Sequence, residues 1–575
     1  MSQIRHVEIR NFRVVKHLIW KPTPGLNCLI GAGDSGKSTI LEAIDLALGA
    51  RRSYSFSDAD FNGLNTDTPI EIFVTIGLLA PDLLNYEKYG KFLRAFDLQN
   101  KLLHDEPANG CETVITIRLV VDKDLNPDWL LYSDRALAED IERRLPWKHR
   151  ELISPARLGT ISSHHLGWSN RSVLNKLSED SIDVSDTLTR LGRATRDSFR
   201  EQKIDGIDEI LTKVKTIANK LGVSVEQLEA QLDVGSISFS NGAISLHGDN
   251  NTPLKQLGTG SSRLLISGLQ KESSSSNILI IDEAEYGLEP FRITRLLNEL
   301  GSKDAEPQQQ VFITTHSPYV LRELQAQQLF VVRKLQAPLP PPNLSYSHII
   351  YSLTNSYEDQ STLRVCAEAF FSKVVIVCEG KTEIGLVKGI DLYSQSLGRD
   401  SIQAQGVFCT DGGGDSMFTR ALVFKKLGYH TVILKDSDKD GEHQQHIQTC
   451  INNGIGIFSW GNNFATENAL FSCCPSTCIP LLLNYAVSLK GEQSINQHIS
   501  DLSQNSYNLQ TALVTDTPDL RVILGNAAKK KGWFKDIEPA EYISLNIIGP
   551  NYSNFSAQFT TPINQLFQNV LNPKG

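Results

Sequence analysis

Residues 31–38 read Gly-Ala-Gly-Asp-Ser-Gly-Lys-Ser and have the spacing of a phosphate-binding loop. Glycines let backbone N–H groups close around phosphate oxygens, and the N-terminus of a following helix adds partial positive charge. A chance glycine turn is the alternative, but the run follows a strand-like segment and opens a helix-like one, as the motif requires. We therefore predict that the nucleotide is bound by Gly31, Gly33, Ser35, Gly36, Lys37, Ser38 and Thr39, with Lys37 on the β- and γ-phosphates and Ser38 on Mg²⁺.

Residues 278–283 read Ile-Leu-Ile-Ile-Asp-Glu, a short apolar run that ends in two carboxylates. Four apolar residues predict a buried strand, and Asp282 would leave its carboxyl end to hold Mg²⁺ through water. Glu283 could then polarise the attacking water of ATP hydrolysis. Alone this run has little specificity, but together with the phosphate-binding loop it predicts an ATPase site.

Two further segments fit such a site. Residues 256–263 form a polar, glycine-rich turn before a helix-like segment, and Gly258, Gly260 and Ser261 could offer N–H groups to a γ-phosphate. His316 follows the strand-like residues 311–315. A lone histidine is usually structural, but its position after the acidic strand favours a γ-phosphate sensor.

A second set of carboxylates follows two other apolar runs. Glu379 comes directly after residues 374–378, and Glu383 lies four positions later, on the same face of a helix that starts there. Asp436 and Asp438 follow residues 431–435 in the same way. Acidic groups this close repel one another unless a hard divalent cation such as Mg²⁺, Mn²⁺ or Ca²⁺ neutralises them. A solvated acidic loop is the alternative, but both runs are typical of buried parallel strands.

The elements around these residues alternate between strand-like and helix-like patterns. We expect strands at residues 69–79 and 113–121, a helix at 38–48 and a hairpin centred on the Asn-Gly pair of residues 236–246. Charged and apolar residues interleave at helical spacing over residues 174–234, which predicts a helical insertion: an arm, a dimerisation element or an ordinary solvated helical subdomain. The proline-rich residues 337–342 predict a stiff connector or surface loop.

The composition is that of an ordinary globular protein. The chain has 575 residues, 40% hydrophobic and 21% charged, with a net charge of −9. This excludes a disordered chain, a collagen and a disulfide-stapled miniprotein, and the length predicts roughly three or four domains. The acidic net charge argues against a general nucleic-acid coat but is compatible with a local basic groove.

The sequence predicts a cytoplasmic protein without membrane contact. No apolar run is long enough to span a bilayer, and the N-terminus lacks the pattern of a signal peptide. Nine scattered cysteines, an odd number, suggest reduced thiols. Cys473, Cys474 and Cys478 could form part of a zinc knuckle, but no second Cys/His pair lies at ligand spacing, so free thiols are favoured.

The order of phosphate-binding loop, long insertion, glycine turn, acidic strand and histidine resembles the ABC-type ATPase heads of the RecF and SMC class, over about residues 1–335. In that class the glycine signature of one head completes the ATP site of another, which implies a homodimer or a higher oligomer. Residues 282–290 are similar to the acidic segment that follows the same strand in that class. They differ from it at Ala284, where the class usually has proline, and at Glu289, where it usually has histidine.

Glu-Gly after one strand and Asp-x-Asp after another look like a Toprim domain, and an ABC-type head followed by Toprim resembles the OLD (overcoming lysogenisation defect) family of nucleases. The resemblance implies a two-metal site with Glu379 between the metals and Glu383, Asp436 and Asp438 completing the shells. It adds Asp411 and Glu467 as acidic ligands and Lys535 as an active-site lysine. Asp411 could instead be a turn residue, and Lys535 competes with the lysines at 529–531.

These features predict an α/β chain in five segments. We expect the N-terminal part of an ABC-type ATPase at 1–173, a helical insertion that could serve dimerisation at 174–234, the rest of the ATPase at 235–345, a linker at 346–372 and a Toprim domain at 373–575.

The predicted activity is that of a metal-dependent DNA endonuclease or nickase, with Glu379, Asp436 and Lys535 in the nuclease site and Glu283 in the ATPase site. ATP binding and hydrolysis would regulate it, and the resemblance implies a setting in bacterial anti-phage defence. It leaves a helicase or retron partner open. The alternative is a DNA-binding clamp of DNA repair without nuclease activity. A topoisomerase would need an active-site tyrosine on a DNA-binding helical domain, for which the sequence offers no context.

Overall fold

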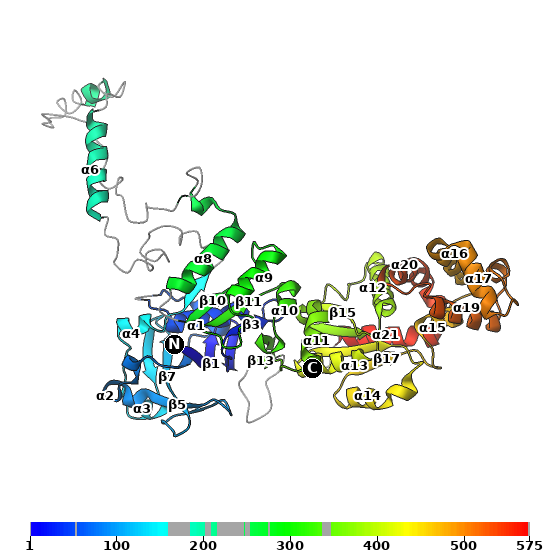
Figure 1. Cartoon of the computed structure of the whole chain (residues 1–575), viewed down its shortest axis with the longest axis horizontal. Helices are drawn as coiled ribbons and strands as arrows, with labels where there is room; N and C mark the ends of the chain where they lie inside the picture. Colours follow the sequence, from blue (N-terminus) through cyan, green and yellow to red (C-terminus); the bar gives the residue numbers. More distant parts are fainter. Residues whose placement is uncertain are drawn as a thin grey trace.

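The computed structural model of the chain describes residues 2–51, 54–158, 185–201, 209–214, 247, 253–273, 277–335 and 347–572. Three sheets organise these residues. Two belong to the N-terminal part, drawn in blue to green, and the third belongs to the C-terminal part, drawn in yellow to red (Figure 1).

The first sheet is antiparallel, with the order β2-β1-β4-β7-β5-β6 and β8 paired with β7. Its strands are β1 (Gln3–Phe12), β2 (Val15–Trp20), β4 (Ile70–Gly77), β5 (Leu93–Asp97), β6 (Leu102–His104), β7 (Glu112–Val121) and β8 (Pro127–Tyr132). In β1, Val7 and Ile9 are fully buried while Arg10 is exposed, the alternation of a sheet with one covered face. The strands predicted at 69–79 and 113–121 are β4 and β7.

The second sheet has the order β13-β12-β3-β11-β10-β9, and all its neighbours are parallel except β12 and β13. Its strands are β3 (Leu26–Ile30), β9 (Ala156–Leu158), β10 (Ile278–Ile281), β11 (Gln310–Thr314), β12 (Leu329–Lys334) and β13 (His348–Ser352). Every residue of β3 and β10 is buried, as expected for parallel strands covered on both faces. The carboxyl ends of β3, β10 and β11 therefore share one edge of the sheet.

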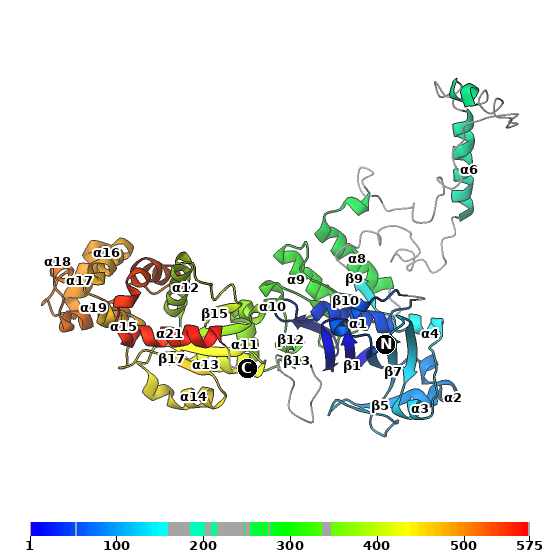
Figure 2. The same ribbon diagram turned by 180° about the vertical axis from the view of Figure 1, so that it is seen from behind.

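The helices of the N-terminal part are α1 (Lys37–Leu48), η1 (Asp58–Asp60), η2 (Asn62–Leu64), η3 (Pro81–Leu84), α2 (Tyr86–Tyr89), η4 (Gly90–Phe92), α3 (Asp134–Ala138), α4 (Trp147–Glu151), α6 (Ser185–Glu201), η8 (Leu254–Gln256), α8 (Thr259–Ser273), α9 (Pro290–Glu299), α10 (Pro318–Glu323) and η9 (Ala326–Gln328). The helix predicted at 38–48 is α1. In Figures 1 and 2, α6 projects away from the sheets.

Within the predicted insertion at 174–234, α6 and residues 209–214 are helical. The rest of that insertion lies outside the described residues. So do the predicted hairpin at 236–246 and the proline-rich residues 337–342.

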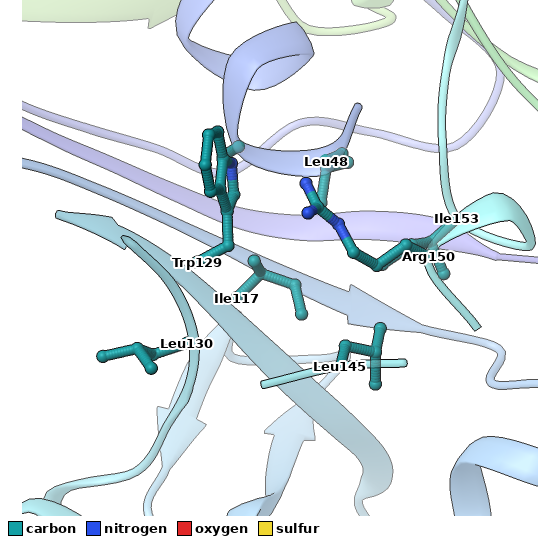
Figure 3. Close-up of a pocket in the computed structure, with 8 residues that line it drawn as sticks. Leu48, Ile117, Trp129, Leu130, Leu145, Arg150 and Ile153 are labelled. Atoms are coloured by element: carbon teal, nitrogen blue, oxygen red, sulfur yellow. The ribbon is translucent and has the colours of Figure 1, made fainter. Parts of the chain in front are cut away.

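A small, mostly apolar pocket marks the corner where the C-terminal end of α1 meets β7 and β8 (Figure 3). The Trp129 indole N–H donates to the carbonyl of Leu46 at 2.9 Å, and the Arg150 guanidinium donates to the carbonyl of Gly49 at 2.6 Å. Arg150 also lies 5.0 Å from the centre of a Trp129 ring. Because carbonyls at a helix end have no partner within the helix, these contacts anchor α1.

The third sheet is parallel, with the order β15-β14-β16-β17. Its strands are β14 (Val374–Cys378), β15 (Val407–Asp411), β16 (His430–Lys435) and β17 (Gly456–Ser459). Helices α13 and α14 lie on one side of this sheet and α12 and α20 on the other (Figure 1). Val375 and Val377 face the first side and Ile376 and Cys378 the second, so β14 is buried on both faces.

The helices of the C-terminal part are α11 (Tyr357–Val365), η10 (Ala367–Phe371), α12 (Lys381–Ser396), α13 (Ser416–Lys426), α14 (Asp440–Asn452), α15 (Thr466–Cys473), α16 (Cys478–Lys490), α17 (Glu492–Leu502), α18 (Leu509–Val514), α19 (Pro518–Lys531), α20 (Ile537–Ile543), the π-helix η11 (Ser544–Ile548), η12 (Gly549–Asn554) and α21 (Ala557–Leu571). One apolar core runs from Leu321 of α10 through Phe370 of η10 to Val377 of β14. The two parts are thus joined by a packed core.

Across the described ranges, the structure contains no helix that combines the length and the apolar character needed to cross a bilayer. All nine cysteines are free thiols.

Candidate active sites

The phosphate-binding loop connects β3 to α1 and depends on two of its glycines. Gly31 has a φ of +153°, and a Cβ there would lie 2.5 Å from the carbonyl oxygen of Val332. Gly36 has a φ of +88° and stands directly before the first residue of α1. Both positions therefore disfavour any side chain. The loop directs the N-terminus of α1 toward the edge of the sheet where β10 and β11 also end.

Lys37 and Ser38 meet the acidic strand at this edge. The Lys37 Nζ donates to the carbonyl oxygens of Gly31 at 3.1 Å and Ala32 at 3.2 Å. Burial lowers the pKa of Lys37, and the negative charges of Asp282 and Asp34 oppose that change. The Ser38 hydroxyl lies 3.2 Å from Oδ1 of Asp282. The structure thus brings together the two predicted Mg²⁺ residues, 244 positions apart in the chain.

The acidic residues after β10 are held by β11. The Thr314 hydroxyl donates to Oδ1 of Asp282 and accepts the backbone N–H of Glu283 at 2.8 Å. Glu285 accepts the Thr315 hydroxyl and the backbone N–H of His316, each at 2.6 Å. The sequence reasoning missed Thr314 and Glu285. Both lie inside the runs that pointed to Asp282 and His316, but their roles depend on the pairing of β10 with β11.

His316 is exposed at the end of β11. Its ring lies 6.3 Å, centre to centre, from the ring of Phe371 in η10. The predicted γ-phosphate sensor therefore contacts the segment that leads directly into β14.

The glycine signature forms the start of α8. A Cβ on Gly260 would lie 2.5 Å from the carbonyl oxygen of Gly287, and Arg292 donates to the Ser261 hydroxyl at 3.0 Å. Gly258 is exposed, and among the described residues beyond its chain neighbours no atom lies within 4 Å of where its Cβ would be. The buried Arg263 donates hydrogen bonds to the carbonyl oxygens of Asp282 at 3.2 Å and Glu283 at 3.0 Å. These bonds connect α8 to the residues after β10, a contact that the sequence did not predict.

In the C-terminal part, carboxylates from β14, α12, β16 and α15 gather at the carboxyl edge of the sheet. Oε2 of Glu379 accepts the backbone N–H of Asp436 at 3.0 Å. Glu383 accepts the Gly380 N–H at 2.9 Å and the Thr466 hydroxyl at 2.7 Å. Thr466 also contacts Oδ1 of Asp436, with its hydroxyl and its backbone N–H each at 2.9 Å.

These carboxylates perturb one another. Burial, reinforced by the charges of Glu383, Glu379 and Glu467, raises the pKa of Asp436 to about 9. Burial, together with Glu467 and Glu379, raises the pKa of Glu383 to about 7. Like charges held this close favour the neutral form unless a cation offsets them. The raised pKa values therefore place Glu379, Glu383, Asp436 and Glu467 in one electrostatic cluster.

Two lysines border this cluster. The Lys529 Nζ lies 2.5 Å from Oδ2 of Asp438. Burial raises the pKa of Glu467, while the positive charges of Lys535 and Lys529 oppose the rise. Lys535 therefore lies near the acidic cluster. Lys529, which the sequence offered only as a competitor of Lys535, contacts the carboxylate of Asp438, whose charge also raises the pKa of Glu467.

Asp411 ends β15, paired in register with Cys378 of β14. Its Oδ1 accepts the backbone N–H of Gly413 at 2.8 Å, and Arg420 donates to its carbonyl oxygen at 2.7 Å. The carboxylate is engaged with its own glycine loop, the geometry of a turn residue. Its assignment as a metal ligand stays a prediction.

In the part of the chain that the structure describes, no group of three or more His, Cys, Asp or Glu side chains is arranged to hold a metal ion. In this structure Glu379, Glu383, Asp436 and Asp438 instead use oxygens to accept hydrogen bonds from protein groups. The donor set nevertheless fits hard divalent cations, because it consists of carboxylate oxygens whose mutual repulsion a cation would remove. Residues fit to hold cations are Ser38 and Asp282 at the nucleotide site and Glu379, Glu383, Asp436, Asp438 and Glu467 at the second site.

Two protein families match the chain. Residues 26–322 match the family described as "AAA domain, putative AbiEii toxin, Type IV TA system". Residues 370–438 match the "Overcoming lysogenization defect protein-like, TOPRIM domain". The first match spans more than half of the chain and contains the nucleotide site. The second includes Glu379, Glu383, Asp436 and Asp438.

Among curated proteins, the chain is similar to "DNA replication and repair protein RecF" from two bacteria. It is 52% identical over 54 residues to the protein of Nitrosococcus oceani, covering 9% of this chain and 15% of that protein. It is 49% identical over 51 residues to the protein of Pseudoalteromonas atlantica, covering 9% of this chain and 14% of that protein. The matched segment is thus a small fraction of either relative.

Solved structures similar to the chain include an SMC head bound to the C-winged helix domain of ScpA, at 16% identity and a TM-score of 0.34, covering 61% of this chain and 98% of that one. The SMC head domain from Thermotoga maritima is 12% identical to the chain, with a TM-score of 0.29. This match covers 61% of this chain and 99% of that one. Because these scores are low, the fold assignment depends on the family matches and the strand orders. The chain belongs to the OLD (overcoming lysogenisation defect) family and consists of an AAA ATPase domain followed by an OLD-like Toprim α/β domain.

Proposed function

We propose that this protein is a metal-dependent DNA endonuclease or nickase whose activity is regulated by ATP binding and hydrolysis. The observation that carries the proposal is the electrostatic cluster of Glu379, Glu383, Asp436 and Glu467 at the carboxyl edge of the Toprim sheet. Stability alone gives no reason to bury like charges together, since each pays a desolvation penalty and repels the others. Strongly perturbed carboxylates of this kind are typical of functional sites.

The cluster and its lysines supply complementary chemistry. Glu379 and Asp436 would hold divalent cations, with Glu383, Asp438 and Glu467 completing the set. When bound, such cations supply an acidified water and stabilise the leaving oxygen of a phosphodiester. Lys529 and Lys535 would contact the phosphate and offset the negative charge that develops on it, because both lie at the border of the cluster.

The ATPase half would bind Mg²⁺-ATP between Lys37, Ser38 and Asp282, with Glu283 orienting the attacking water. The exposed Gly258 at the start of α8 is open to a second copy of the chain. We propose that ATP joins two ATPase heads, so that the protein is a homodimer or a higher homo-oligomer with DNA as its substrate.

Two features support ATP control of the Toprim site. The ring of His316 contacts that of Phe371, three residues before β14, and β14 ends at Glu379. The α10 residue Arg322 contacts Glu368 and the carbonyl of Arg364. A change at the nucleotide can therefore reach the nuclease strand through packed side chains. By family resemblance we place this activity in anti-phage defence in the bacterial cytoplasm, where reduced thiols persist.

The second candidate is a DNA-binding clamp of DNA repair without nuclease activity, which the short match to the RecF proteins favours. It would leave the carboxylate cluster without a role. The ATP-dependent retention of DNA, without cleavage, is the result that would select it.

The experiment is incubation of supercoiled plasmid with the full-length protein and Mg²⁺ or Mn²⁺, with and without ATP. We expect nicked or linear DNA that disappears on addition of a chelator and in the Glu379→Ala variant. If wild type leaves the plasmid intact under all these conditions, the nuclease proposal is wrong.

A further inference from the structure

Thr466, the first residue of α15, contacts carboxylates from two other elements. Its hydroxyl lies 2.7 Å from Oε1 of Glu383 and 2.9 Å from Oδ1 of Asp436. Its backbone N–H donates to the same Asp436 oxygen at 2.9 Å. The side chain is buried, with 4% of the residue exposed.

These bonds are not the usual cap of a helix. The residue before α15 is Ala465, which has no side chain able to cap it. The Thr466 hydroxyl instead points to Glu383 of α12 and to Asp436 after β16. A threonine hydroxyl is small and rigid at χ1, so it sets a short and definite separation between the two carboxylates.

Backbone N–H groups hold the other oxygens of these carboxylates. Oε2 of Glu383 accepts the N–H of Gly380, the residue after Glu379, at 2.9 Å. Oε2 of Glu379 accepts the Asp436 N–H at 3.0 Å. Thr466 thus orients Glu383 and Asp436, and the backbone N–H groups of Gly380 and Asp436 orient Glu383 and Glu379.

We propose that Thr466 is a positioning residue of the Toprim site. Its hydroxyl lies between the carboxylates of Glu383 and Asp436 and fixes their separation. The site therefore needs a lower concentration of divalent cation. This inference rests on the proposed nuclease function. Without the hydroxyl, Glu383 would lose its hydrogen bond from Thr466, and Asp436 would keep only the bond from the Thr466 backbone N–H. Loss of a partner that orients a metal ligand typically weakens metal affinity or activity by about 10- to 100-fold.

The test compares Thr466→Val, which keeps the shape and the backbone N–H but removes the hydroxyl, with Thr466→Ser, which restores a hydroxyl. Mn²⁺ binding to the nucleotide-free, full-length protein is measured by titration calorimetry in the absence of DNA, with Glu379→Ala identifying the signal of this site. We expect Thr466→Val to bind Mn²⁺ at least about 10-fold more weakly than wild type and Thr466→Ser to bind within about threefold of it.

Plasmid cleavage as a function of Mn²⁺ concentration gives a second readout. Thr466→Val should need more Mn²⁺ for half-maximal cleavage and should approach the wild-type rate at saturation. A purely structural role would instead lower the saturating rate together with the melting temperature. Thr449→Val is the matched control, because the Thr449 hydroxyl bonds only to the Gln445 carbonyl of its own helix among the hydrogen bonds of the described residues.

If Thr466→Val binds Mn²⁺ as tightly as wild type, the inference is overturned while the nuclease proposal stands. The inference is also overturned if Thr466→Ser binds Mn²⁺ as weakly as Thr466→Val does. If Thr466→Val does not fold, Thr466→Ala replaces it with the same expectation. A wild-type protein that neither binds Mn²⁺ in the absence of nucleotide nor cleaves DNA would contradict the proposed function itself.

Discussion

Asp282 and Asp436 both follow a buried parallel strand, yet their surroundings suit them to different chemistry. Asp282 faces the hydroxyls of Ser38 and Thr314, which suits an aspartate that shares a cation with a nucleotide. Asp436 lies among other carboxylates, and its burial, together with their charges, raises its pKa to about 9. At the residue scale, Asp282 of the ATPase site is surrounded by hydroxyl groups, whereas Asp436 of the Toprim site is surrounded by carboxylates. We therefore expect a mutation in one site to leave the activity of the other unchanged.

Replacement of Glu379 by alanine should abolish cleavage and leave ATP binding intact. The variant removes an oxygen ligand from the Toprim cluster and touches none of the nucleotide residues. We expect the cleavage rate to fall at least about 100-fold, the scale of losing one contact to the transition state. Glu492→Ala, an exposed acidic residue at the start of α17, is the control and should cleave normally. Cleavage by Glu379→Ala at the wild-type rate, with trace nuclease excluded, would refute the assignment.

Replacement of Glu283 by glutamine should slow ATP hydrolysis by about 100-fold or more while ATP stays bound, because the amide cannot act as a general base. Lys37→Ala should instead weaken nucleotide binding itself, since its Nζ stands at the phosphate-binding loop. Fluorescent-nucleotide titration and phosphate release separate the two effects. Normal hydrolysis by Glu283→Gln would show that another residue orients the water.

At the element scale, the position of Glu383 depends on close packing between α12 and α20. A Cβ on Gly385 would lie 2.4 Å from the Ile537 carbonyl oxygen, and one on Gly389 would lie 2.4 Å from that of Glu541. These two glycines, one helical turn apart, let the backbones approach. The contact fixes the helix that carries Glu383 relative to the residues that follow Lys535.

Replacement of Gly385 by alanine should therefore destabilise the protein by about 1–3 kcal/mol, the usual cost of overpacking a buried contact. The matched control is Gly441→Ala in α14, where no atom of the described residues outside its own stretch of helix lies within 4 Å of the new Cβ. Because alanine favours a helix over glycine by about 1 kcal/mol, this control should be neutral or slightly stabilising. Chemical denaturation of both variants measures the difference. Equal stability of the two would show that the α12–α20 contact yields easily.

At the scale of the whole molecule, the two sites lie in separate domains that share one apolar core. Phosphodiester hydrolysis is downhill, so the proposed nuclease would need no energy from ATP, and ATP would act by favouring one arrangement of the domains. Such coupling typically amounts to about 1–3 kcal/mol, or roughly 5- to 150-fold in the affected equilibrium. The contact of His316 with Phe371 links the end of β11 to the segment that precedes β14.

We accordingly expect cleavage to differ between the nucleotide-free protein and the protein with ATP or with a non-hydrolysable analogue. Phe371→Ala should reduce that difference and leave nucleotide-free cleavage and ATP hydrolysis near wild type. Phe291→Ala, an exposed phenylalanine on α9, is the control and should keep the full nucleotide effect. Identical rates in all three nucleotide states of wild type would contradict regulation. Cleavage only during hydrolysis would show that ATP turnover drives the cycle.

Local sequence was sufficient for much of this protein. The phosphate-binding loop, the strands β4, β7 and β14 and the helix α1 follow from patterns confined to about ten residues, because glycine conformation and apolar periodicity act locally. The carboxylates at 379, 383, 436 and 438 were also recognisable, since each follows an apolar run that had to be a buried parallel strand. The order of these motifs along the chain was enough to predict the OLD family.

Only the tertiary structure decided which residues complete the sites. Thr314, Glu285, Arg263 and Thr466 are ordinary in sequence, and their roles arise because neighbouring strands and helices bring them to carboxylates far away in the chain. Lys529 contacts Asp438 across 91 positions, a pairing that no local pattern could rank above Lys535. The contact between His316 and Phe371 likewise depends on how the second and third sheets share a core. Local propensity determines elements, whereas long-range packing determines which side chains meet.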